Sequence, residues 1–351
     1  MRDFGVVRTD ERTGVEVVQL TTRDVMNYHQ YCYGQWITGD ERTLLYFSPR
    51  ELIRQSPVDL WCVNADGTDS ALLVEGGLWS TISPDNSTVY SGVGNRVVAV
   101  PLAKDRSGTA SPPIPRTVFE SDTSSLFLIN AISRDGRYLF CQTVAKAGGM
   151  TYTRIDLRDG SGVELFRTQS IMHLQLHDGE PGYLLASVIP PEMEYGIYTF
   201  DFDGKDFRKL PFIRSTNHYA SLGRTGYVIT SVHNPDRKIE IARPGDAHAE
   251  VLVEGPGFWH PTSDESGEWI ASDTNWPDTG LYLIHAPSGR HRVLCYPDAS
   301  CGHPQWTHAH PRMSPCANYV VFDSDRYGGI SHVFAARIPS ELKSALREGT
   351  E

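Results

Sequence analysis

The chain has 351 residues, of which 40% are hydrophobic and 21% are charged, as in an ordinary globular protein with a buried core. Its net charge of -11 argues against nucleic acid or an anionic membrane surface as the main partner. No apolar run is long enough to span a membrane, and the N-terminus lacks the pattern of a signal peptide. Because the six cysteines form no C-x-x-C pair, we expect free thiols and a cytoplasmic protein.

A short unit repeats along the chain at intervals of roughly 40 to 50 residues. Each unit has an apolar strand, a turn, an alternating strand and a third strand that often ends in Asp-Gly or Ser-Gly. The turns are rich in Ser, Pro, Asp, Asn and Gly, which favour tight turns through their side chains or backbone dihedrals. In chain order, the turns begin at Thr38, Ser83, Ser133, Leu176, Leu222, Ser263 and Ser314.

This repeat predicts an all-β fold, a single β-propeller domain over residues 1–351 with four short strands in each blade. We count seven blades, and the alternative is six blades with an extra β subdomain. The expected blades cover residues 25–75, 76–122, 123–169, 170–213, 214–254, 255–299 and 300–338. The last blade is one strand short, so we expect the orphan strand at 12–22 to join it and remove an exposed edge. A short helix is expected over 339–347.

Histidines recur at one position of this repeat, just before the turn on the innermost strand of a blade. Those positions should converge on the central channel of a propeller. Five of the seven units place histidine there: His29, His173, His218, His260 and the pair His308 and His310.

Four of these channel residues carry the donor types of a metal site. His308 and His310 are two residues apart, so on a strand both project from the same face. Gln305 adds an amide oxygen, and His260 holds the matching position on the neighbouring blade. We predict that His260, Gln305, His308 and His310 bind a divalent metal as a Lewis acid for an anionic ligand. The donors suit Mn, Fe, Co, Ni or Zn, and the alternative is that the histidines only pack.

His218, on the blade next to these residues, is a candidate general base. His173 and Gln175, one blade further, are candidates for holding substrate hydroxyls. Aromatic and short polar side chains that suit a sugar should line the same pocket, namely Tyr28, His29, Trp79, Asn130 and Tyr219. The alternative for all of them is a structural role in the channel wall.

The segments His260, Gln305-x-x-His308-x-His310-Pro311 and 320–326 resemble the oligogalacturonate lyases of polysaccharide lyase family 22. The match is strong over about 210–335 and weak before 170. The resemblance implies a seven-bladed propeller that holds manganese through three histidines and a glutamine. It also implies that His218, in the segment 216–218, is the catalytic base. The implied reaction is β-elimination on a small acidic oligosaccharide, giving a 4,5-unsaturated product.

One departure from the family's pattern concerns an arginine of the fourth blade, thought to assist at the substrate carboxylate. The segment 192–197 offers none, so Arg214, Arg312 or Arg326 would have to bind that carboxylate, or the substrate is not galacturonate. Two other functions stay open: a propeller metalloenzyme for another sugar acid, and a non-catalytic scaffold like the TolB-type propellers. The identity of the uronic acid, the metal used in the cell and the oligomeric state are left open by the sequence.

Overall fold

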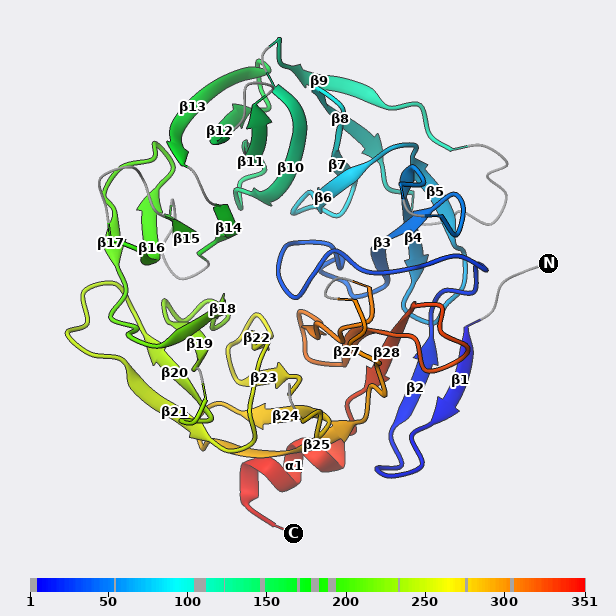
Figure 1. Cartoon of the computed structure of the whole chain (residues 1–351), viewed down its shortest axis with the longest axis vertical. Helices are drawn as coiled ribbons and strands as arrows, with labels where there is room; N and C mark the ends of the chain where they lie inside the picture. Colours follow the sequence, from blue (N-terminus) through cyan, green and yellow to red (C-terminus); the bar gives the residue numbers. More distant parts are fainter. Residues whose placement is uncertain are drawn as a thin grey trace.

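The computed structural model describes the chain except for residues 1–4, 54, 104–111, 123, 146–148, 169–170, 178–182, 189–193, 233, 275–276, 304–305 and 351. In this described part, seven antiparallel sheets stand in a ring around a central channel (Figure 1). The prediction of a seven-bladed propeller is therefore confirmed, and the six-bladed alternative is wrong.

The sheets follow the chain in order, and their first strands lie nearest the channel (Figure 1). The first blade contains β3 (Thr43–Pro49), β4 (Val58–Asn64) and β5 (Ala71–Val74), and isolated bridges from Tyr28 and Ile37 take the place of its inner strand. The second blade contains β6 (Leu78–Ile82), β7 (Thr88–Val93), β8 (Arg96–Pro101) and β9 (Arg116–Glu120). The third contains β10 (Ser124–Ile132), β11 (Tyr138–Ala145), β12 (Met150–Asp156) and β13 (Ser161–Thr168).

The remaining blades repeat this order. The fourth contains β14 (Ile171–Leu176), β15 (Tyr183–Val188), β16 (Gly196–Asp201) and β17 (Arg208–Lys209). The fifth contains β18 (Ser215–Ser221), β19 (Val228–Val232), β20 (Lys238–Ala242) and β21 (Glu250–Glu254). The sixth contains β22 (Thr262–Ser263), β23 (Trp269–Ser272), β24 (Leu281–His285) and β25 (Arg290–Cys295). The seventh contains β26 (Arg312–Met313), β27 (Tyr319–Ser324) and β28 (His332–Arg337), followed by the N-terminal strands β2 (Glu16–Gln19) and β1 (Val6–Thr9).

The same hydrogen bond closes the turn after the inner strand in several blades. The hydroxyl oxygen of Ser83 accepts from the backbone N–H of Thr88 at 2.9 Å, and Ser133 does the same for Tyr138 at 2.8 Å. In the sixth blade a carboxylate oxygen of Asp264 replaces the hydroxyl and accepts from the N–H of Trp269 at 2.9 Å. The recurring Ser or Asp therefore fixes where each inner strand stops and the next strand starts.

The N-terminal segment closes the ring as predicted. β2 pairs antiparallel with β28, with Val17 opposite Ala336 and Val18 opposite Ala335. Both valines are buried, so the pairing adds apolar contacts to its backbone hydrogen bonds. The added strand β1, which the sequence did not predict, pairs with β2 at the edge of this sheet.

The short C-terminal helix is also confirmed, as α1 (Ser340–Glu348). It starts after Pro339 and ends at Gly349, whose φ of 75° is the left-handed conformation that glycine adopts at low cost. Leu346 is buried against the rest of the protein, and Arg290 of β25 donates to its carbonyl at 2.6 Å.

The loop before β3 crosses the channel instead of following the rim (Figure 1). We call its residues 28–37 the channel plug. Trp36 anchors the plug: its ring is fully buried and stacks on His29 at 4.8 Å, and its indole N–H is shared between the carbonyls of Tyr31 (3.0 Å) and Tyr33 (3.1 Å). Tyr31, Cys32 and Tyr33 are buried as one cluster. The channel is therefore divided by the plug.

All six cysteines are free thiols, as expected, and Cys32, Cys62, Cys141 and Cys295 are buried. Among the described residues, none of the helices has the length and hydropathy needed to cross a membrane.

Candidate metal centre

Five of the six predicted channel histidines come together at one mouth of the channel, which we call the histidine mouth. The ring centre of His260 lies 4.4 Å from that of His310 and 6.3 Å from that of His308, and the rings of His308 and His310 are 5.4 Å apart. The ring of His218 is 4.4 Å from that of His260, and His173 follows at 5.9 Å from His218. The cluster therefore spans four consecutive blades, from the fourth to the seventh.

The backbone is distorted where these inner strands begin. His173, Asn217 and His310 have positive φ values of 66°, 65° and 42°, and Trp79 of the second blade has 29°. The pairing of β6, β14 and β18 with the strand that follows each of them shifts register at the same places. A bulge re-aims the side chains that follow it, and strained backbone concentrates at functional sites. The alternation of polar and apolar residues along the chain contains no sign of these bulges.

Burial keeps the central imidazoles neutral. Desolvation lowers the pKa of His260 and His310 well below the usual value, lowers that of His308, and brings that of His173 to about 4. A neutral imidazole keeps a lone pair on one ring nitrogen, which is the form that binds a metal. These histidines would therefore not need to lose a proton at neutral pH before they bind a metal ion.

A buried carboxylate orients His260. The Nδ1 atom of His260 lies 2.8 Å from Asp273, and its backbone N–H donates to the same carboxylate at 2.8 Å. Burial raises the pKa of Asp273 to about 7 and lowers that of His260, so both shifts favour the neutral forms within this shared hydrogen bond. With Nδ1 held in this way, Nε2 is the nitrogen left to bind a ligand, as in carboxylate–histidine–metal arrangements.

The donor set fits a divalent metal, whereas a complete metal centre is not formed by the described side chains. Among the residues that the structure describes, no group of three His, Cys, Asp or Glu side chains is arranged as a metal-binding group. Gln305, the fourth predicted ligand, lies outside the described residues. The assignment of His260, His308 and His310 as ligands stays a prediction, now with three neutral imidazoles gathered and one of them oriented by a carboxylate.

His218, the predicted base, stands beside this cluster. Its Nδ1 atom lies 3.1 Å from the hydroxyl oxygen of Thr216, and its ring packs 4.9 Å from that of Trp259. The side chain is partly exposed at the mouth. The ring therefore stands beside the cluster, where an imidazole can transfer a proton to or from a bound molecule.

The channel plug supplies two residues that sequence analysis missed. The ring of Tyr31 lies 4.5 Å from that of His310 and 5.2 Å from that of His173, and the ring of Tyr33 lies 5.1 Å from that of His173. Tyr31 has a φ of 107°, a conformation that disfavours residues other than glycine. The signal in the sequence was the aromatic stretch 31–36, which lengthens the inner segment of the first blade beyond that of the other blades.

His29 lies inside the plug rather than at the mouth. Its Nδ1 accepts from the backbone N–H of Tyr31 at 3.0 Å, and its Nε2 lies 3.4 Å from the carbonyl of Ala309. Its own N–H donates to Asp323 at 3.1 Å. Burial lowers the pKa of His29 to about 3, so the ring is neutral at physiological pH. Substrate contact by His29 would require it to leave these partners.

The other predicted pocket residues separate into three groups. Tyr28 and Trp79 lie beside Phe47 at the histidine mouth, with ring centres 5.6 and 6.4 Å from it. Tyr219 is buried, and its hydroxyl bonds to the N–H of Ser187 and to the carbonyl of His173, which places it between the fourth and fifth blades. Asn130 and Gln175 line a cavity on the far side of the plug.

The three candidate cations are engaged elsewhere. Arg326 donates to the carbonyls of Pro297 and Tyr296, and only 8% of its side chain is exposed. Arg214 forms an ion pair with Asp236 at 2.8 Å. Arg312 reaches the cavity beyond the plug. A role in binding a substrate carboxylate at the histidine mouth stays a prediction for Arg326 and would require these contacts to change.

The arrangement defines a class of protein: a seven-bladed β-propeller with a histidine cluster at one mouth of its channel. No model of a protein family matches the chain, and no curated protein sequence matches it significantly.

Comparison with solved structures narrows the class. The chain is similar to an oligogalacturonate lyase in complex with manganese, with 18% identity, 98% of each chain covered and a TM-score of 0.80. It is also similar to the oligogalacturonate lyase from Vibrio parahaemolyticus, with 16% identity, 97% of this chain and 98% of that chain covered, and a TM-score of 0.77. The β-propeller domain of the trilobed protease from Pyrococcus furiosus reaches a TM-score of 0.52 at 13% identity, over 87% of this chain and 95% of that chain. The resemblance noted from the sequence is thus confirmed for the fold along the whole chain, including the region before residue 170.

Proposed function

We propose that this protein is a metal-dependent lyase that cleaves uronic-acid-containing oligosaccharides by β-elimination. The observation that carries the proposal is the cluster of neutral imidazoles from His260, His308 and His310, with His218 beside it at a ring distance of 4.4 Å from His260. The whole-chain similarity to oligogalacturonate lyases supports it, and one of those structures contains manganese, which is the metal proposed here.

In this proposal each residue has one task. His260, His308 and His310 hold a divalent metal, with Gln305 as a fourth ligand, and Asp273 keeps the ring of His260 in its orientation. When bound, the metal would supply Lewis acidity toward the carboxylate of the uronic acid. Tyr31 and Tyr33 form the floor of the site, because their rings pack against His310 and His173.

His218 takes the proton from C5 of the uronic acid. The electron pair of the broken C5–H bond forms the C4=C5 double bond, and the bond between C4 and the glycosidic oxygen breaks. The leaving oxygen takes a proton from solvent and His218 releases its proton to solvent, so no water is consumed overall. The imidazole of His218, with Thr216 3.1 Å from its Nδ1, would accept the C5 proton through a ring nitrogen.

The test is the ultraviolet absorbance of the conjugated product. Metal-stripped protein is mixed with digalacturonate, trigalacturonate and other uronide oligosaccharides, with and without Mn²⁺. We expect absorbance that depends on manganese. His308→Ala should lose both the absorbance and metal binding, whereas His218→Gln should lose the absorbance and still bind metal. The exposed His248, replaced by Ala, serves as the matched control.

The outcomes separate the alternatives. A signal with another uronide alone would keep the reaction and change the substrate. Absence of product from every uronide, in protein shown to hold metal, would overturn the elimination and favour metal chemistry on another sugar acid. Failure to bind any divalent metal would favour a non-catalytic scaffold.

A further inference from the structure

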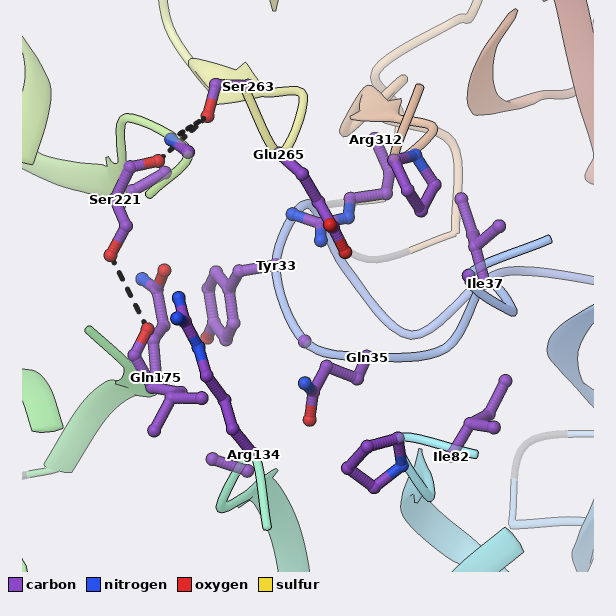
Figure 2. Close-up of a pocket in the computed structure, with 18 of the residues that line it drawn as sticks. Tyr33, Gln35, Ile37, Ile82, Arg134, Gln175, Ser221, Ser263, Glu265 and Arg312 are labelled. Atoms are coloured by element: carbon purple, nitrogen blue, oxygen red, sulfur yellow. Dashed lines mark hydrogen bonds between the residues drawn. The ribbon is translucent and has the colours of Figure 1, made fainter. Parts of the chain in front are cut away.

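A cavity opens at the other end of the channel from the histidines, where the inner strands end in turns; we call this the turn mouth. Its volume is about 310 Å³, at the small end of the range for ligand sites and of a size for a single sugar ring. Turns from several blades contribute to it, including Ser83, Arg134, Arg224 and Glu265. Figure 2 shows Arg134, Gln35 and Gln175 turned toward its centre.

The plug separates this cavity from the histidine mouth. Tyr33 lines the cavity, and its ring contacts His173 at 5.1 Å and Tyr31 at 5.0 Å. The lining includes none of the five clustered histidines. A ligand in this cavity would therefore not touch the proposed metal ligands.

Two buried acceptors in the lining point to a ligand with hydroxyl groups. Asn130 is only 8% exposed, and its Oδ1 has no hydrogen-bond partner among the described residues. The Oε1 atom of Gln35 is likewise buried without a partner there, and the Gln35 side chain enters the cavity (Figure 2). A buried acceptor left unsatisfied is costly, and each of these atoms needs a donor, which the O–H of a ligand or of an ordered water can supply.

The charges of the lining favour an anion. In the described lining, three arginines, Arg134, Arg224 and Arg312, stand against two carboxylates, Asp264 and Glu265, in a chain whose net charge is -11. The carboxylate of Asp264 accepts from the backbone N–H of Trp269 at 2.9 Å, and Glu265 forms an ion pair with Arg224 at 2.7 Å. Among these described residues guanidinium groups outnumber carboxylates, and a guanidinium matches the geometry of a carboxylate.

We propose that the turn-mouth cavity is a second binding site, for a small carboxylic acid that carries several hydroxyl groups, of the size of one sugar acid. Its carboxylate binds the guanidinium of Arg134, and its hydroxyls donate to Oδ1 of Asn130 and Oε1 of Gln35. The site is independent of the proposed lyase activity, because the plug separates it from the histidines.

Titration calorimetry on the full-length, metal-stripped protein tests this site. The probes are D-galacturonate and D-glucuronate, with D-galactose as the neutral control and acetate as the control without hydroxyls. We expect one molecule of a sugar acid to bind per chain at millimolar concentrations, and more tightly than either control.

The variants locate the binding. Arg134→Gln and Asn130→Ala should each weaken it roughly tenfold, the loss expected for a buried or charge-assisted hydrogen bond. His308→Ala and the exposed-arginine control Arg243→Gln should leave it unchanged, with all four variants checked for an unaltered melting temperature. Binding that persists in Arg134→Gln and Asn130→Ala but is lost in His308→Ala would place the acid at the histidine mouth and overturn the proposal. The proposal would also be overturned if neither D-galacturonate nor D-glucuronate binds.

Discussion

Replacement of Trp36 by Phe tests whether the channel plug is held by its indole hydrogen bonds. Trp36 is fully buried, and its single N–H serves the carbonyls of Tyr31 and Tyr33. Phenylalanine keeps an aromatic ring against His29 and removes the donor. We expect a loss of about 1 to 3 kcal/mol from the unsatisfied carbonyls and roughly 1 to 2 kcal/mol from the smaller ring, which together give about 2 to 5 kcal/mol.

Trp61 provides a matched control. It is only partly buried, and its indole nitrogen has no hydrogen-bond partner among the described residues. Its guanidinium neighbour Arg23 lies 4.1 Å from the ring centre, so Trp61→Phe loses ring area and part of a cation–π contact, about 1 kcal/mol.

Urea unfolding of both variants, followed by circular dichroism, measures the difference in the free energy of unfolding. Equal destabilisation by the two substitutions would refute the view that the indole N–H holds the plug. A further result would support it: Trp36→Phe should also weaken metal binding at the histidine mouth, because Tyr31 packs on His310.

Three more predictions follow from the geometry. Burial lowers the pKa of His29 from 6.5 to about 3, so below about pH 6.5 the unfolded chain takes up a proton that the folded chain does not. The melting temperature should therefore fall from pH 7 to pH 4, and it should fall less in His29→Gln. An equal fall in the two proteins would contradict this origin of the pH dependence. Gly223→Ala should lower the free energy of unfolding in urea by about 3 kcal/mol, because φ is +51° and the added Cβ would lie 2.4 Å from a backbone nitrogen. The control Gly226→Ala, with φ +83° and open space around the added Cβ, should lower it by about 1 kcal/mol. Asp273→Asn should weaken manganese binding roughly 10- to 100-fold in a chelator competition, and an affinity equal to that of Asp278→Asn would show that Asp273 does not orient a ligand.

The repeated units could be predicted because turn chemistry and strand alternation are local properties. The hydroxyl of Ser83 or Ser133 closes its turn with a hydrogen bond to a residue five positions later, so the sequence itself contains the information. Ring closure was also predictable, because an orphan strand such as 12–22 needs a partner and the last blade lacked one.

The division of the channel was not predictable in the same way. Asn130 and Gln175 precede their turns in the sequence just as His173 does, yet they line the opposite cavity. The reason is tertiary: bulges in β10 and β14 change which side chains face the channel, and the plug then separates Asn130 and Gln175 from the histidines. Neither a bulge nor a long-range loop insertion has a period that a single sequence shows.

The sheet that closes the ring also contacts the plug and lies next to the histidine mouth. The seventh blade, which pairs with β2, begins directly after His308 and His310. Asp323 on β27 of this blade accepts a hydrogen bond from the backbone N–H of His29 in the plug. Parting of β2 from β28 would loosen this blade and with it the histidine mouth and the plug. If the histidine mouth holds a metal as proposed, the rate of metal release would depend on how often β2 separates from β28.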